Sequence, residues 1–194
     1  MKIKYKVIFL DIDGVLNGYN FWSMLGWKLV CLTHSDKIKN WYRTVADPCG
    51  VHESKVRRLA KVIHQTNAKV VMSSSWRDYF WKVPYEKKHD RQKKLVDLLN
   101  KYNIEIIDIT PHSTNGQRDA EILTWLAQHE NEVENFIILD DENSFLKAFH
   151  EDKRFIQTSS VPKGKIIMGF WYEDTGLKNK HVKPAIDILN NYTI

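Results

Sequence analysis

Residues 5–17 read Tyr-Lys-Val-Ile-Phe-Leu-Asp-Ile-Asp-Gly-Val-Leu-Asn, so an apolar run ends abruptly in two acids and a glycine. The apolar part, residues 7–10, has the length of a buried strand, and Gly14 allows a sharp turn after it. Asp11 and Asp13 therefore follow the carboxyl end of a strand, where burial is costly for a charge that is neither paired nor bound to a metal. The stretch predicts a buried strand that delivers two carboxylates to one edge of a sheet.

Two carboxylates in this position suit a hard cation such as Mg2+, which prefers oxygen ligands. Beside such a cation Asp11 stays ionised and can attack an electrophilic phosphorus. Asp13 can protonate a leaving alcohol and later deprotonate water. The alternative is that both acids only cap a turn, because Asp and Gly are common turn formers.

The composition is that of a globular protein. The chain has 194 residues, 43% of them apolar, which is enough for one domain with a sizeable core. No run reaches the roughly 20 apolar residues of a membrane span. The N-terminus enters the first strand without room for a signal peptide, and Cys31 and Cys49 are too few for a disulfide framework. We expect a cytoplasmic protein with no membrane partner, and the net charge of +5 weakly favours a polyanionic one.

Apolar runs and amphipathic stretches alternate along the rest of the chain. The pattern predicts further strands at 68–72, 104–109, 136–139 and 155–158, and an edge strand at 166–171. It predicts helices at 53–66, around 95–102, from 118, from 145 and at 182–191. Strands that alternate with helices indicate an α/β fold with a parallel sheet, whose ligands bind at the carboxyl ends of the strands.

Two segments leave their interpretation open. Residues 18–50 lack periodicity and predict a small cap-like insertion within a single domain, 1–194. Its aromatic residues form either a satellite core or a stacking platform for bases. They are Tyr19, Phe21, Trp22, Trp27, Trp41 and Tyr42. The basic stretch 82–94 is either a solvated helix face or a groove for a phosphate backbone, with Trp81 and Tyr85 available for stacking.

Polar residues follow the second predicted strand. Ser73 is the first of them, and its hydroxyl and neighbouring backbone N–H groups suit a phosphate oxygen. Ser74 remains possible, because the sequence does not fix where the strand stops. Arg77 either grips a substrate phosphate with its planar fork or forms a surface ion pair.

The later part of the chain adds two acids and a cation. Asp140 and Asp141 follow the strand at 136–139 and repeat the pattern of Asp11 and Asp13, although an acidic cap on the next helix is the alternative. Arg118 opens a predicted helix, where the residues themselves predict a surface ion pair with Glu121, three residues on.

The motifs, taken together, resemble those of the haloacid dehalogenase (HAD) superfamily, in its phosphatase branch. They are Asp-Ile-Asp-Gly-Val-Leu-Asn at 11–17, Ser-Ser-Ser-Trp-Arg at 73–77, Arg-x-x-Glu-Ile-x-x-Trp-Leu at 118–126 and Ile-Leu-Asp-Asp at 138–141. In detail they look like the HAD group associated with RNA-repair proteins and the 3′-phosphatase domain of phage-type polynucleotide kinase. The resemblance implies a HAD-like (Rossmann-like) parallel sheet flanked by helices, with the cap-like insertion after the first strand.

The resemblance also implies a role for each motif residue. Asp11 would be the nucleophile and a metal ligand, and Asp13 the general acid and base, with its backbone carbonyl on the metal. Ser73 (or Ser74) would bind the transferred phosphoryl group. Arg118 would take the place of the family's usual Lys. Asp140 and Asp141 would hold Mg2+. One of them would bind the metal directly, and the other would act through a water molecule or through contacts with the direct ligands.

The expected function is that of a Mg2+-dependent phosphomonoesterase acting through an aspartyl-phosphate, most simply on the 3′-phosphate of a nucleic-acid end. The alternatives are a small-molecule or nucleotide phosphatase and a non-catalytic nucleic-acid-binding module. The chain contains no Gly-x-x-x-x-Gly-Lys-Ser/Thr loop for a kinase reaction, so a repair role would need partner enzymes.

Overall fold

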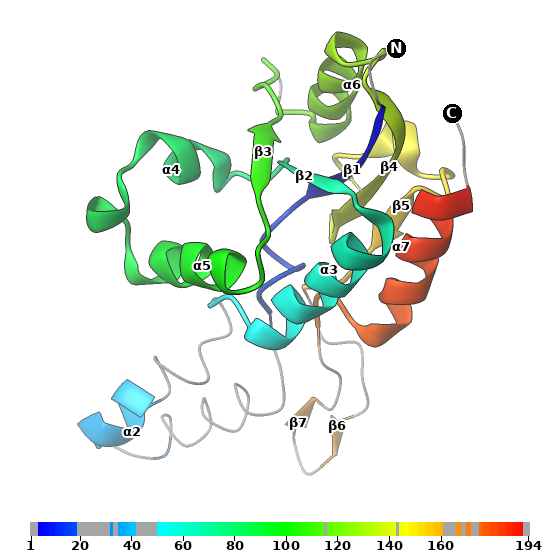
Figure 1. Cartoon of the computed structure of the whole chain (residues 1–194). Helices are drawn as coiled ribbons and strands as arrows, with labels where there is room; N and C mark the ends of the chain where they lie inside the picture. The colour runs from blue at the N-terminus through cyan, green and yellow to red at the C-terminus, as the bar shows by residue number, and fades with distance from the viewer. Residues whose placement is uncertain are drawn as a thin grey trace.

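The structure, a computed structural model, describes residues 4–18, 32, 35–41, 50–114, 116–142, 144–160, 166–167, 170–171 and 175–191. A five-stranded parallel sheet with the order β3-β2-β1-β4-β5 forms its centre (Figure 1). The strands are β1 Tyr5–Leu10, β2 Lys69–Met72, β3 Ile106–Ile109, β4 Val133–Asp140 and β5 Phe155–Gln157. The predicted strand at 7–10 is therefore the central strand, with β2 on one side and β4 on the other.

Helices cover both faces of the sheet (Figure 1). The helices of the described residues are α2 Asp36–Trp41, α3 Glu53–Thr66, α4 Arg77–Lys82, α5 Asp90–Lys101, α6 Arg118–Gln128 and α7 Asn179–Asn191, of which α2 lies apart from the sheet. Because side chains alternate along a strand, Ile8 and Leu10 join the core formed with α3, α5 and α7, whereas Val7 and Phe9 join the core formed with α6. None of the described helices combines the length and the apolar character that crossing a membrane requires.

Burial of β1 on both faces explains why the chain is built around it. Val7, Ile8, Phe9 and Leu10 are fully inaccessible to solvent, and each such side chain contributes roughly 1.5–3 kcal/mol to folding. Leu10 is level with Met72 of β2 and with Leu139 of β4. The residues that follow these three positions consequently emerge at the same edge of the sheet.

The predicted fold class is confirmed, and two predicted elements are wrong. The helix expected from residue 145 is only a 3-10 turn, Lys147–Phe149 (η3), because residues 141–154 must return directly from β4 to its neighbour β5. The edge strand expected at 166–171 is not part of the main sheet. Its residues form two short strands, β6 Ile166–Ile167 and β7 Phe170–Trp171, which pair antiparallel with each other.

Most of the expected insertion at 18–50 lies outside the described residues, and α2 is its described helix. The aromatic residues Tyr19, Phe21, Trp22, Trp27 and Tyr42 lie outside them as well. The basic stretch 82–94 is described in full. It runs from the end of α4 through a 3-10 turn, η2 Tyr85–Lys87, into the first half of α5.

Candidate active site

Three carboxylates meet where β1 and β4 end. The backbone N–H of Asp11 donates to the carbonyl of Leu139 (3.0 Å), so Asp11 extends the pairing between the two strands by one residue. Asp140 is the last residue of β4, and Asp141 follows it. Carboxylate oxygens of the three acids all lie within 4.8 Å of one another, with Asp11 and Asp140 buried and Asp141 half-buried. The structure thus brings together the acids of the first and fourth motifs.

Gly14 permits this close approach. Its φ of +68° lies in the left-handed region, and a Cβ placed on it would lie 2.2 Å from Cγ of Asp141. A side chain at this position would therefore collide with the third carboxylate of the cluster. The glycine that the sequence analysis assigned to a sharp turn also makes room for Asp141.

Arg118 is the cation of the cluster. Its Nη1 donates to Oδ2 of Asp140 in a very short contact and lies 3.5 Å from Oδ1 of Asp11. The alternative pairing of Arg118 with Glu121 is not found, since the Glu121 carboxylate pairs with Arg77. Arg118 stands at the first position of α6, so this helix points its N-terminal end at the acids.

One arginine does not balance three acids. Burial raises the pKa of Asp11 to about 7, and Asp140 adds to the rise, while Arg118 opposes it. Burial also raises the pKa of Asp140, again against the effect of Arg118. A divalent cation stabilises such a close cluster of three carboxylates, because it supplies the missing positive charge and accepts hard oxygen ligands. The donor set therefore fits a divalent metal ion held by Asp11, Asp140 and Asp141.

Asp13 lies outside this cluster and is held separately. It is exposed, and its two carboxylate oxygens accept hydrogen bonds from Asn17 Nδ2 (2.6 Å) and from the indole Nε1 of Trp76 (3.0 Å). The Oδ1 atom of Asn17 in turn accepts from the backbone N–H of Gly14 (2.7 Å). The carboxylate is thus oriented from both sides, and it remains accessible to a leaving group or to water.

Trp76 and Asn17 were not assigned a role from the sequence. Both stand inside the motifs quoted above, Asn17 at the end of the first and Trp76 within the second. Membership of those motifs was the available signal, because Trp76 is 63 residues away from Asp13 in the chain.

The two candidate serines have different surroundings. The Ser74 side chain interacts with the Asp11 carboxylate and works to lower the pKa of Asp11, and its hydroxyl accepts from the backbone N–H of Trp76 (3.4 Å). Ser73 continues β2 with its backbone N–H, which donates to the carbonyl of Leu10 (3.0 Å). The Ser73 hydroxyl is completely buried and has no hydrogen-bond partner among the described residues. The hydroxyl that faces Asp11 therefore belongs to Ser74, the residue that the sequence analysis kept as its second choice.

The structure does not bring Arg77 to the phosphate site. The residue is 4% exposed, and its guanidinium forms a two-pronged ion pair with Glu121, with both N–O distances at 2.9 Å. It also donates to the Ser73 carbonyl and to Thr110 Oγ1, each at 3.2 Å, and lies 2.7 Å from His112 Nδ1. Neither of the two predicted roles, a phosphate contact or a surface ion pair, describes this arrangement. The ion pair is buried, and it uses the guanidinium N–H groups that would have bound a phosphate.

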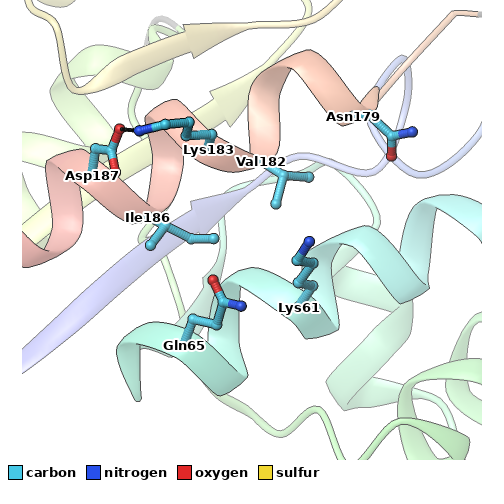
Figure 2. A pocket seen from close by; sticks show the side chains of 7 residues that line it. All are labelled: Lys61, Gln65, Asn179, Val182, Lys183, Ile186 and Asp187. Atoms are coloured by element: carbon cyan, nitrogen blue, oxygen red, sulfur yellow. Dashed lines mark hydrogen bonds and ion pairs between the residues drawn. The ribbon is translucent and has the colours of Figure 1, made fainter.

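A groove of about 360 Å3 lies elsewhere, between α3 and α7 (Figure 2). It is lined by Lys61, Gln65, Asn179, Val182, Lys183, Ile186 and Asp187. Figure 2 shows its one carboxylate, Asp187, paired with Lys183 on the same helix. This groove lacks the surplus of acids found at the strand ends, so we place the candidate active site at Asp11 and its neighbours.

The comparisons with known proteins agree with this placement. The family model described as the HAD domain in Swiss Army Knife RNA repair proteins matches residues 7–162, a range that contains all four motifs. No curated protein and no solved structure matches the chain. Membership of this family indicates a phosphatase-type hydrolase, and HAD domains typically use a divalent metal, which suits the three carboxylates. The chain belongs to the family of HAD domains found in Swiss Army Knife RNA repair proteins.

Proposed function

We propose that the protein is a Mg2+-dependent phosphomonoesterase that removes a terminal phosphate, most simply a 3′-phosphate, from nucleic acid through an aspartyl-phosphate intermediate. The observation that carries the proposal is the meeting of Asp11, Asp140 and Asp141 within 4.8 Å, with Arg118 beside them. The family supports the choice of a nucleic acid as the substrate, because its members are described as domains of RNA repair proteins.

Asp11 is the nucleophile of this proposal. A carboxylate oxygen of Asp11 forms a bond to phosphorus as the bond from phosphorus to the ester oxygen breaks. Ser74 and Arg118 hold phosphoryl oxygens, since both already contact the Asp11 carboxylate that the phosphoryl group would reach. Asp11, Asp140 and Asp141 would hold the metal, which supplies positive charge that offsets the repulsion between the phosphate and Asp11.

Asp13 moves the protons. Its carboxyl group gives a proton to the departing ester oxygen, so that the nucleic acid leaves with a hydroxyl end. The same carboxylate then takes a proton from a water molecule that attacks the aspartyl-phosphate, which releases inorganic phosphate and restores Asp11. Trp76 and Asn17 fix the orientation of Asp13 for both steps, because each donates a hydrogen bond to one of its oxygens.

The test is phosphate release from a 3′-phosphorylated oligonucleotide and from a 3′-mononucleotide, with Mg2+ and with EDTA. Asp11→Asn is the matched control, because it keeps the size of the side chain and removes the nucleophilic oxygen. We expect release that needs Mg2+, favours the oligonucleotide and falls at least about a thousandfold in Asp11→Asn. The fold of the variant is checked by circular dichroism.

Each other outcome replaces the proposal with one alternative. Faster turnover of the mononucleotide would assign the site to a small-molecule or nucleotide phosphatase. Release that is unchanged in Asp11→Asn would rule out the aspartyl-phosphate. Binding of nucleic acid without release from either substrate would leave a non-catalytic binding module.

A further inference from the structure

Three exposed aromatic side chains lie close together in the chain, just beyond the candidate active site. Tyr79 and Trp81 of α4 are 54% and 49% exposed, and Tyr85 of η2 is 43% exposed. Three other large apolar side chains are exposed in the described part of the chain, at Leu32, Leu123 and Phe145, and they are scattered. Single exposed apolar residues are ordinary, whereas three exposed aromatic side chains in one seven-residue segment favour a binding role for that segment. Tyr79 and Trp81 are two positions apart on α4, so they face different sides of this helix. We call Tyr79, Trp81 and Tyr85 the aromatic platform.

A buried lysine holds the backbone of the platform in place. The ammonium of Lys88 donates to the carbonyls of Tyr79 (2.7 Å), Phe80 (2.8 Å) and Val83 (2.5 Å). It thereby satisfies carbonyls at the end of α4 that have no partner within the helix. Burial lowers the pKa of Lys88, the direction expected for an ammonium taken out of water to serve the backbone.

Two of the aromatic rings also have fixed neighbours. The Tyr85 hydroxyl donates to Oδ1 of Asp97 on α5 (2.8 Å), and Trp81 packs edge-on against Phe80 with their ring centres 5.6 Å apart. A surface that is ordered before it binds loses less conformational entropy when a partner arrives. The platform is thus prepared for binding rather than being a loosely solvated helix face.

The charge around the platform favours a polyanion. Between residues 78 and 94, the basic side chains other than the buried Lys88 outnumber the acidic ones. The basic residues are Lys82, Lys87, Arg91, Lys93 and Lys94, and the acidic residues are Asp78, Glu86 and Asp90. Lys93 stands 6.0 Å from the centre of the Tyr85 ring, so a cation and a stacking face lie side by side. Aromatic faces among cations are what the bases and phosphates of a single strand require.

The platform is continuous with the catalytic residues. α4 begins at Arg77, directly after Trp76, whose indole contacts Asp13, and three residues after Ser74, whose side chain interacts with Asp11. Its six residues make it about 9 Å long, so Tyr79 and Trp81 lie within a few nucleotides' reach of the strand end. α4 and α5 lie on the β3 side of the sheet, away from α7 (Figure 1).

We infer that the aromatic platform and the basic side chains around it seat the single-stranded part of a polynucleotide whose terminal phosphate lies at Asp11. The inference rests on the proposed function and deepens it, since it states where the body of the substrate binds. The bases stack on Tyr79, Trp81 and Tyr85, and Lys87 and Lys94 contact backbone phosphates.

Binding and turnover are tested separately on the full chain. The binding probe is a fluorescent single-stranded RNA of about eight nucleotides with a 3′-hydroxyl end, followed by fluorescence anisotropy without turnover. Tyr79→Ala/Trp81→Ala should weaken binding about 10- to 100-fold, because each stacked base loses its aromatic partner. Leu123→Ala, which truncates an exposed apolar side chain of α6, should leave the affinity unchanged.

The charges are tested by the salt dependence of the same binding. In Lys87→Gln/Lys94→Gln the slope of log affinity against log salt should fall by about 1.4, since each lost phosphate contact removes about 0.7. Lys61→Gln/Lys180→Gln removes two exposed lysines from α3 and α7 and should leave the slope as it is. In turnover, the Tyr79→Ala/Trp81→Ala variant should raise KM for a 3′-phosphorylated RNA and leave hydrolysis of p-nitrophenyl phosphate unchanged.

The outcomes separate this inference from the proposed function. Binding that needs the platform, without phosphate release from any substrate, would support the surface and overturn the phosphatase. Phosphate release with equal RNA affinity in the wild type and in Tyr79→Ala/Trp81→Ala would support the phosphatase and overturn the surface. Failure of the wild type to bind RNA would also overturn the surface.

Discussion

Arg77 and Arg118 both form ion pairs near the carboxyl ends of the strands, yet the charge around them is balanced in one case and not in the other. Arg77 meets one carboxylate, that of Glu121, and its remaining contacts are to the Ser73 carbonyl, the Thr110 hydroxyl and the His112 ring. Arg118 meets Asp140 and Asp11, with Asp141 in the same cluster. A balanced buried pair supports the fold, whereas a surplus of buried negative charge makes a place for a cation. The balance of charge around each arginine therefore distinguishes their roles, whereas both arginines belong to the motifs.

The largest effect is expected from breaking the balanced pair. Arg77→Met leaves the Glu121 carboxylate buried without its cation, and it should lower the free energy of unfolding by about 3–5 kcal/mol. The measurement is equilibrium unfolding in urea, at fixed Mg2+ concentration.

The matched control for Arg77→Met is Arg77→Met/Glu121→Gln, which removes both charges. It should recover much of the lost stability, because no unpaired charge stays buried. A double variant that is no more stable than Arg77→Met would show that the packing of Arg77 matters, and not the ion pair.

A middle-sized effect is expected from filling the unbalanced site. Mg2+ should raise the free energy of unfolding of the wild type by about 2.7 kcal/mol at a hundredfold excess over its Kd, because the folded chain alone gathers the three acids. The increase should be absent in Asp140→Asn. Thermal unfolding with Mg2+ and with EDTA measures both.

Arg118→Met sharpens the same comparison. Loss of this cation leaves Asp11 and Asp140 without their counter-charge, so we expect a less stable chain in EDTA and a substantial recovery with Mg2+. Arg77→Met should show no such preferential recovery, since its uncompensated acid, Glu121, lies outside the metal cluster. Equal recovery in the two variants would contradict the distinction between the arginines.

The sequence was sufficient to predict the sheet and its acids. The apolar run from Val7 to Leu10 has the length of a strand buried on both faces and ends at a turn signal, and Asp140 follows an apolar run of the same kind. Because parallel strands end at one edge, the two acidic motifs had to meet. The same reasoning failed after Asp141. The apolar spacing there predicts a helix from residue 145, but the short connection from β4 to β5 forms only a 3-10 turn.

The partners of the site residues could not be predicted, because they depend on contacts between distant segments. Arg77 and Glu121 are 44 residues apart, and nothing local favours their pairing over a phosphate contact. The choice between Ser73 and Ser74 depends on how the backbone turns after β2 ends at Met72. Leu10 lies level with Met72, so the strand register alone would place Ser73 level with Asp11, yet it is the Ser74 side chain that interacts with the Asp11 carboxylate.

The smallest effect is expected from loosening Asp13 without touching the metal cluster. Trp76→Phe keeps an aromatic ring against the core but removes the indole N–H that donates to Oδ2 of Asp13, which leaves the hydrogen bond from Asn17. We expect kcat for a 3′-mononucleotide to fall about tenfold with little change in KM, as one hydrogen bond to a charged group is lost. Trp81→Phe is the matched control and should leave this reaction unchanged.

The leaving group distinguishes a positioning role of Trp76 from a merely structural one. Release of a ribose hydroxyl needs a proton from Asp13, whereas p-nitrophenolate leaves readily without one. Trp76→Phe should therefore slow the mononucleotide reaction far more than hydrolysis of p-nitrophenyl phosphate. Equal slowing of the two reactions would mean that the substitution disturbs the whole site, and Trp76 would then belong to the core and not to the proton transfer.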